Sequence, residues 1–112
     1  MTVSIALEYI PRRMEKLGHG KDYYINFRHI VLQPNEKVEI EAFNQFYILI
    51  DEPENVAIRS DFGIYDLSNE KTNEQFYEHQ GTILIKNYSA TVSHLRFIQV
   101  IPIGKIKTKN ID

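Results

Sequence analysis

The chain has 112 residues, a net charge of −2 and no cysteine. Its 43% hydrophobic and 25% charged residues are ordinary for a single globular domain, which argues against intrinsic disorder and fibrous repeats. The lack of cysteine excludes a disulfide scaffold, a thiolate metal site and a cysteine nucleophile, and no apolar run approaches the ~20 residues of a membrane span.

The first 20 residues are predicted to form either a short helix or an extended arm. Pro11 suits the first position of a helix and Gly18 suits the residue after its end, which predicts a helix over residues 11–17. No secretory signal pattern is present, so we expect the protein to stay in the cytoplasm unless a larger particle carries it out. The apolar residues ahead of the helix are expected to dock on another copy, through Ile5, Leu7 and Tyr9.

Two strands and a turn follow. Residues 23–32 are aromatic and β-branched, and residues 37–43 alternate between apolar and acidic side chains, as half-buried strands do. The intervening residues 33–36, with Pro34 second, predict a turn. We therefore expect an antiparallel hairpin. The apolar run at 46–50 predicts a separate strand that is buried on both faces.

The remaining strands are short until the last one. They are predicted over 56–59, 64–67, 75–79 and 82–87. Residues 93–103 carry apolar groups on both faces, which predicts a central strand whose pairing stops near Pro102. The predicted core consists of Phe27, Ile30, Leu32, Val38, Ile40, Phe46, Ile48, Ile50, Ile83, Ile85, Leu95, Phe97 and Val100.

Many short strands without a long helix predict an all-β fold, an antiparallel, jelly-roll-like β-sandwich. We expect this sandwich domain over residues 21–104, after the arm or helix of residues 1–20. A basic tail, residues 105–112, is expected to follow it.

The sequence offers no recognisable catalytic constellation. It contains no nucleophile elbow, phosphate loop or dinucleotide-binding motif, so we expect no enzyme activity and no cofactor. None of the four histidines has the close spacing of metal ligands, so we also expect no metal site. His29 and His94 nevertheless lie on separate predicted strands, and the fold alone decides whether they meet.

Charge is unevenly distributed along the chain. Residues 51–80 have a net charge of −6 and residues 81–112 a net charge of +4, and opposite patches steer association between copies. The tail is predicted either to fray or to add to another copy's sheet through Lys105, Lys107 and Lys109. This basic stretch is too short to predict nucleic-acid binding, and no membrane partner is expected.

Two long stretches, FRHIVLQPNEKVEIEAFNQFYILID and HQGTILIKNYSATVSHLRFIQVIP, resemble the small β-sandwich virion proteins of tailed bacteriophages. These are head-decoration, head-fibre or fibre-base modules. The resemblance implies a non-enzymatic structural protein that is made in the host cytoplasm and located in the virion. It also implies a homo-oligomer, with a trimer favoured, that contacts other virion proteins. The alternative is a carbohydrate- or ligand-binding β-sandwich that uses exposed Tyr and Phe side chains as stacking platforms.

Overall fold

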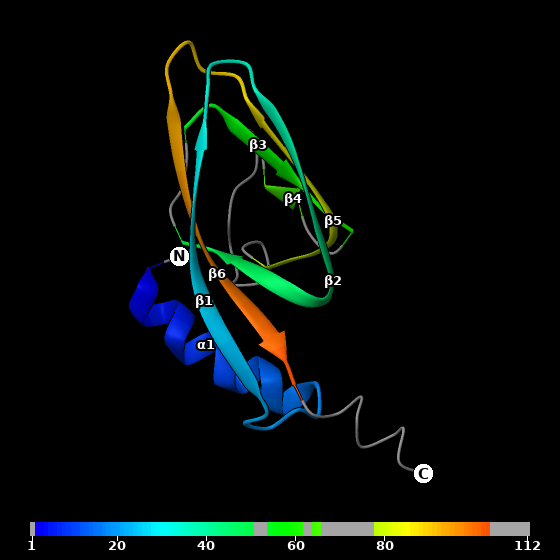
Figure 1. Ribbon diagram of the computed structural model, residues 1–112. Helices are drawn as coiled ribbons and strands as arrows, with labels where there is room; N and C mark the ends of the chain where they lie inside the picture. Colours follow the sequence, from blue (N-terminus) through cyan, green and yellow to red (C-terminus); the bar gives the residue numbers. More distant parts are fainter. Residues whose placement is uncertain (1, 51–53, 62–63, 66–77, 104–112) are drawn as a thin grey trace.

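A computed structural model describes residues 2–50, 54–61, 64–65 and 78–103 (Figure 1). One helix precedes six strands: α1 (Val3–Lys16), β1 (Tyr23–Leu32), β2 (Lys37–Leu49), β3 (Val56–Arg59), β4 (Ile64–Tyr65), β5 (Glu78–Asn87) and β6 (Ser93–Pro102). The strands form a single antiparallel sheet in the order β1-β6-β2-β5-β3-β4. The prediction of an antiparallel all-β fold with a short N-terminal helix is confirmed. Among the described residues, no helix is long and apolar enough to cross a membrane.

The sheet bends within β2 and so has two limbs. One limb consists of β1, β6 and the second half of β2, and the other consists of the first half of β2 with β5, β3 and β4. The first half of β2, residues 37–42, pairs with β5, and the second half also pairs with β6 from residue 46. Between the halves, Asn44 has a φ of 62° and the register shifts between Ala42 and Tyr47, as in a β-bulge. The predicted strands at 37–43 and 46–50 are thus one bent strand. The predicted jelly-roll-like β-sandwich is not confirmed, because the described strands form one hydrogen-bonded sheet.

The predicted hairpin between β1 and β2 is wrong, although its turn forms. Glu36 N donates to Gln33 O at 3.0 Å, but all ten residues of β1 pair with β6 instead of β2. The buried Asn87 is the last residue of β5, next to the end of β1. Its side-chain nitrogen is 3.3 Å from Leu32 O and 3.0 Å from Thr91 O. It ties the β1–β2 turn to the β5–β6 turn, so the two limbs meet at that end (Figure 1).

The helix is longer than predicted, because Pro11 lies inside it rather than at its start. The side chain of Thr2 accepts from Ile5 N at 3.2 Å and caps the N-terminus. At the other end Gly18 has a φ of 87°, and the next residue donates its N–H to Met14 O at 3.0 Å. This is a Schellman ending, in which glycine adopts the left-handed conformation at little cost.

One face of α1 belongs to the chain's own core. Ala6, Tyr9, Ile10 and Met14 are buried at helical spacing. The helix is therefore not a detached arm. Of the two predicted forms, a short helix or an extended arm, the helix forms, and burial at helical spacing begins at Ala6.

Most of the predicted core is buried, but Phe27 is a clear exception. Its side chain is 64% exposed, whereas the core cluster takes buried residues from α1 and from β1, β2, β3, β5 and β6. Phe27 lies on the edge strand, opposite Ile98 in the register. The other predicted core residues are buried, or partly buried in the case of Ile30, Val38 and Ile40.

Candidate functional site

Strand β1 lies at one end of the sheet, and among the described strands it pairs through only one of its two hydrogen-bonding edges. Ile103 N donates to Asp22 O at 2.8 Å, so the residues that follow Asp22 at steps of two point their backbone groups toward β6. The residues between them point their N–H and C=O groups outward. No strand of the described part of the chain pairs with this outer edge, which is formed by Ile25, Phe27, His29 and Val31.

This edge lacks the features that usually prevent strands of different molecules from pairing. Natural edges are blunted by lysine, proline, bulges or short length. β1 is ten residues long and contains no Lys, Pro or Gly. Its one formally charged residue, Arg28, is occupied, because its Nη1 lies 3.1 Å from both Tyr47 Oη and Gln99 Oε1.

The outer face of β1 is half covered. Near its start, Tyr23 and Ile25 pack against the core and line a crevice with Leu7 of α1. Farther along the same face, Phe27 is 64% and Val31 45% exposed. Side chains on one face of a strand recur every second residue, so these four residues form one stripe. The helix covers only its first half.

Two histidines meet on the bare half of this face. His29 Nε2 lies 3.0 Å from His94 Nδ1, and the rings are 5.1 Å apart between centroids and tilted by 33°. They come from neighbouring strands, because His29 is opposite Arg96 and His94 is opposite Val31 in the β1–β6 register. Both side chains are exposed, so solvent and ions reach them.

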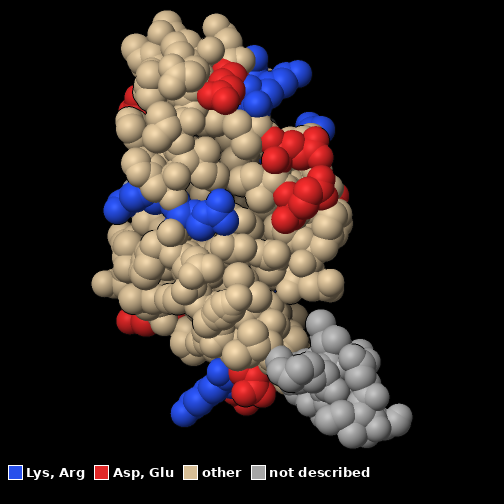
Figure 2. Space-filling view, in the orientation of Figure 1, with Lys and Arg blue, Asp and Glu red and all other residues tan. Residues whose placement is uncertain are grey.

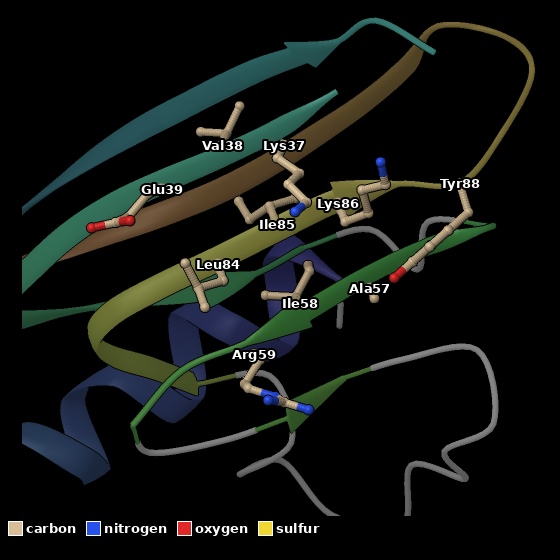
Figure 3. A pocket seen from close by; sticks show the side chains of 10 residues that line it. All are labelled: Lys37, Val38, Glu39, Ala57, Ile58, Arg59, Leu84, Ile85, Lys86 and Tyr88. Carbon is tan, nitrogen blue, oxygen red and sulfur yellow. The ribbon is translucent and has the colours of Figure 1, made fainter. Parts of the chain in front are cut away.

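The other limb carries a polar groove over β2, β3 and β5 (Figure 3). Its volume is about 700 Å³, and three cations line it: Lys37, Arg59 and Lys86. Lys86 Nζ is 2.8 Å from Asn35 O and 5.7 Å from the centroid of the Tyr88 ring. Figure 2 shows both basic and acidic side chains on the side where Figure 1 places β2 and β5. Cations beside an exposed aromatic ring suit a sugar or an anion.

Two glutamates on β2 interact on this same limb. A hydrogen bond with Glu39 raises the pKa of Glu41, and desolvation and repulsion from Glu39 and Asp61 add to the rise. Glu41 therefore holds a proton more readily than an isolated glutamate does. Within the described residues, no group of three or more His, Asp or Glu side chains is placed to hold a metal ion.

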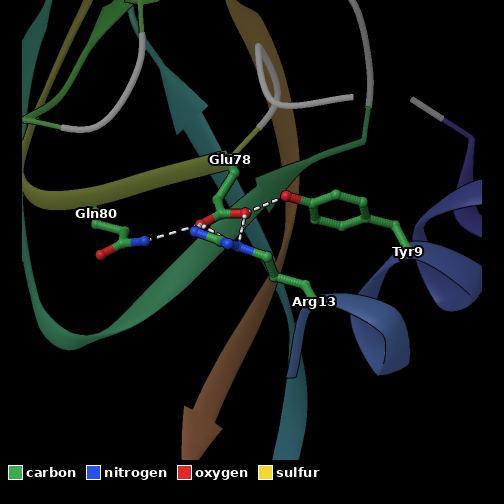
Figure 4. Close-up of polar contacts among 4 residues, drawn as sticks. All are labelled: Tyr9, Arg13, Glu78 and Gln80. Carbon is green, nitrogen blue, oxygen red and sulfur yellow. Dashed lines mark hydrogen bonds and ion pairs between the residues drawn. The ribbon is translucent and has the colours of Figure 1, made fainter. Parts of the chain in front are cut away.

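A buried polar network fastens α1 to the sheet (Figure 4). Glu78 is fully buried at the start of β5 and accepts from Arg13 Nε at 3.0 Å, from Gln80 Nε2 at 2.8 Å and from the Tyr9 hydroxyl. Every drawn donor serves the same carboxylate, and no cleft among those described adjoins it. We interpret this network as structural, because it neutralises a charge that would otherwise be costly to bury.

The predicted interface residues have different fates. Ile5 and Leu7 are 43% and 44% exposed and remain candidates for contact with a partner. Tyr9 was predicted to contact another copy, but the helix turns it inward, where it is 6% exposed and donates to Glu78, so little of its side chain is available to a partner. The remaining three, Lys105, Lys107 and Lys109, lie outside the described residues.

Sequence reasoning missed the free edge and the groove for the same reason. Phe27 was predicted to be core, and the cations at positions 37, 59 and 86 are far apart in the sequence. Strand pairing determines both features, and the pattern of neighbouring residues does not predict which strands pair. The proximity of His29 and His94, left open by the sequence, is now established.

Comparisons with protein-family models, curated proteins and solved structures found no match to this chain.

Proposed function

We propose that this chain is a non-enzymatic structural protein that acts by self-assembly, as a component of a virion of the tailed-bacteriophage type. The observation that carries self-assembly is the outer edge of β1, which is long, unpaired in the described structure and without a protective Lys or Pro. The virion assignment rests on the sequence resemblance. Contacts with other virion proteins and virion localisation belong to the same proposal.

The edge suits a second copy of itself in antiparallel orientation. Residues directly opposite in an antiparallel pair lie on the same face of the sheet. The two-fold axis must therefore lie midway between the two copies of one residue, which face each other. An axis through Phe27 places the two Phe27 rings together and puts Ile25 opposite His29 of the other copy. In that register Arg28 faces Asn26, so the only formal charge on the strand does not meet itself.

Antiparallel pairing also gives Phe27 and Val31, the exposed apolar side chains of the bare half, neighbours on a second copy. It places the bare half of one β1 beside the helix-covered half of the other, where exposed Ile5 and Leu7 lie on α1. Backbone hydrogen bonds and apolar burial then act together. Because this contact is isologous, it closes as a dimer. The edge therefore favours a dimeric unit over the trimer that the sequence resemblance suggested.

Molar mass in solution, measured by light scattering across a concentration series, tests the proposal. The wild-type protein should reach twice the 13.2 kDa chain mass. Phe27→Lys places a charge on the two-fold axis and should give a monomer. Phe43→Lys is the matched control, because Phe43 is 57% exposed but lies on β2, away from the edge. It should assemble like the wild type.

Two results would overturn the proposal. A wild-type protein that stays monomeric at millimolar concentration has no self-assembly to explain. A Phe27→Lys dimer as tight as the wild-type dimer moves the interface away from β1. Circular dichroism of each variant confirms that the sheet is retained, so a loss of mass is not mistaken for unfolding.

The groove supports a second candidate function, the binding of an acidic carbohydrate or of a different anionic ligand. Tyr88 is 58% exposed, and Lys37 and Lys86 are direct partners across β2 and β5, an arrangement of like charges that an anion would relieve. Titration with an acidic and a neutral oligosaccharide, followed by amide NMR shifts, tests it. Saturable shifts at residues 84–88 with the acidic sugar, lost in Tyr88→Ala, would support this function, whereas the absence of shifts with both sugars would reject it.

A further inference from the structure

The histidine pair on the bare half of β1 has an arrangement that neither self-assembly nor packing requires. The two ring nitrogens that face each other, Nε2 of His29 and Nδ1 of His94, are 3.0 Å apart. One proton can bridge them, with one ring as donor and the other as acceptor. When the bridging proton moves to the outer nitrogen of its own ring, both facing nitrogens present a lone pair. Two such nitrogens can then chelate a metal ion, and imidazole is a common ligand of transition metals.

The separation of the nitrogens discriminates between metals. With metal–nitrogen bonds of about 2.0–2.1 Å, two nitrogens 3.0 Å apart subtend an angle of about 90° at the ion. Neighbouring positions of a square-planar or octahedral ion have this angle. A tetrahedral ion would need the nitrogens roughly 3.4 Å apart, so the histidine rings would have to separate.

We propose that His29 and His94 form a bidentate site for a divalent transition-metal ion, with Cu²⁺ and Ni²⁺ preferred over Zn²⁺ and water in the remaining positions. The preference follows from the angle and agrees with the general order of affinities, in which Cu²⁺ exceeds Ni²⁺ and Zn²⁺. The sequence argued against a metal site because no two histidines are close in the chain. The β1–β6 register brings together two histidines that are 65 residues apart.

The site is complete within one chain and does not depend on self-assembly. It joins β1 to β6, because each strand provides one ligand. An ion that binds only when the two strands are paired must stabilise the folded state. Arg96 is directly opposite His29 in the register, so its side chain is on the same face of the sheet. The positive charge of Arg96 therefore lowers the affinity of this site for a metal cation.

Isothermal titration of the purified protein with CuCl₂, NiCl₂ and ZnCl₂ tests the inference. We expect one ion per chain, binding in the order Cu²⁺, Ni²⁺, Zn²⁺, and a rise in melting temperature with Ni²⁺. His29→Gln and His94→Gln should each weaken binding by about tenfold or more. His19→Gln is the matched control, since His19 lies in the α1–β1 connection, and it should bind like the wild type.

Electron paramagnetic resonance of the Cu²⁺ complex gives an independent readout. Hyperfine splitting from two nitrogens is expected in the wild type and from one in either substituted protein. Wild-type affinity in His29→Gln or His94→Gln would overturn the inference, as would tighter binding of Zn²⁺ than of Cu²⁺ or no binding at millimolar ion. A monomeric protein that binds one ion would leave this site intact while rejecting self-assembly.

Discussion

The two halves of β1 belong to one strand and have side chains on the same outer face, but they differ in how much of that face is buried. At the first half, Tyr23 and Ile25 are sheltered by α1, which a buried ion pair between Arg13 and Glu78 fastens to the sheet. At the second half, Phe27 is bare. Large apolar side chains occur in both halves, so composition alone does not decide burial.

The comparison teaches that apolar residues on an edge strand need a cover, and that the cover need not come from the same chain. The helix is 14 residues long, and its buried residues run from Ala6 to Met14. It therefore spans only the start of a ten-residue strand, because a helix advances 1.5 Å per residue and a strand about 3.3 Å. The uncovered part is the part that we assign to a second copy.

Breaking the covered half should have the largest effect. Arg13→Ala leaves the carboxylate of Glu78 buried with a lost charge partner, so we expect a loss of about 3 kcal/mol or more in the free energy of unfolding. Urea unfolding measures it. Arg12→Ala, one position along the same helix and exposed, should change stability by only about 0.5 kcal/mol. Equal losses in the two variants would show that the ion pair does not fasten the helix.

A cavity in the covered half should have the next largest effect. Met14 is fully buried, and Met14→Ala should lower the free energy of unfolding by about 2–4 kcal/mol. Leu7→Ala removes a similar apolar volume from the same helix at a position that is 44% exposed, and it should cost less than about 1 kcal/mol. Thermal or urea unfolding of dilute protein separates the two. Similar costs would place α1 differently from the packing described.

A charge on the bare half should hardly affect the monomer. Val31→Lys at a side chain that is 45% exposed should change monomer stability by no more than about 0.5 kcal/mol, yet it should abolish any dependence of the melting temperature on protein concentration. Val92→Lys is the matched control, because Val92 is 43% exposed and precedes β6. A concentration dependence that survives in Val31→Lys would contradict the edge contact.

The other limb should show the smallest effect, and it is electrostatic. The pKa of Glu41 is raised above its ordinary value of 4.5, chiefly by its hydrogen bond with Glu39. The folded state therefore binds that proton more tightly than the unfolded chain, and stability is lost as the pH rises through the raised pKa. Glu41→Gln should raise the melting temperature near pH 7 and give no gain at about pH 4. An equal gain at both pH values would show that ionisation is not the cause, and Glu15→Gln on α1 serves as the control.

The sequence was sufficient for elements whose evidence is local. The bounds of β1, the turn at 33–36, the central position of β6 and the end of its pairing near Pro102 all follow from nearby residues. Pro102 is opposite Tyr23, the last pair of the ladder, where a missing N–H breaks no hydrogen bond with β1.

The sequence failed where distant segments compete. The first residues of β2 alternate between apolar and acidic side chains, as expected for a hairpin partner of β1. However, β6 pairs with β1 instead. Pro11 signalled a helix start, but the cap at Thr2 and burial from Ala6 onward outweigh it. The β1 edge and the histidine pair both depend on this competition. The β1–β6 register leaves the outer edge of β1 unpaired among the described strands, and it brings the two histidines together.

Amide hydrogen exchange along β1, followed by NMR at low and high protein concentration, tests the central claim most directly. The N–H groups of Asn26, Arg28 and Ile30 point toward β6 and should be protected at every concentration. The N–H groups of Phe27 and His29 point outward, so they should exchange quickly when the protein is dilute and become protected as copies pair. If these outward groups stay unprotected at high concentration, or are already protected in the monomer, the free edge is not the surface through which this protein assembles.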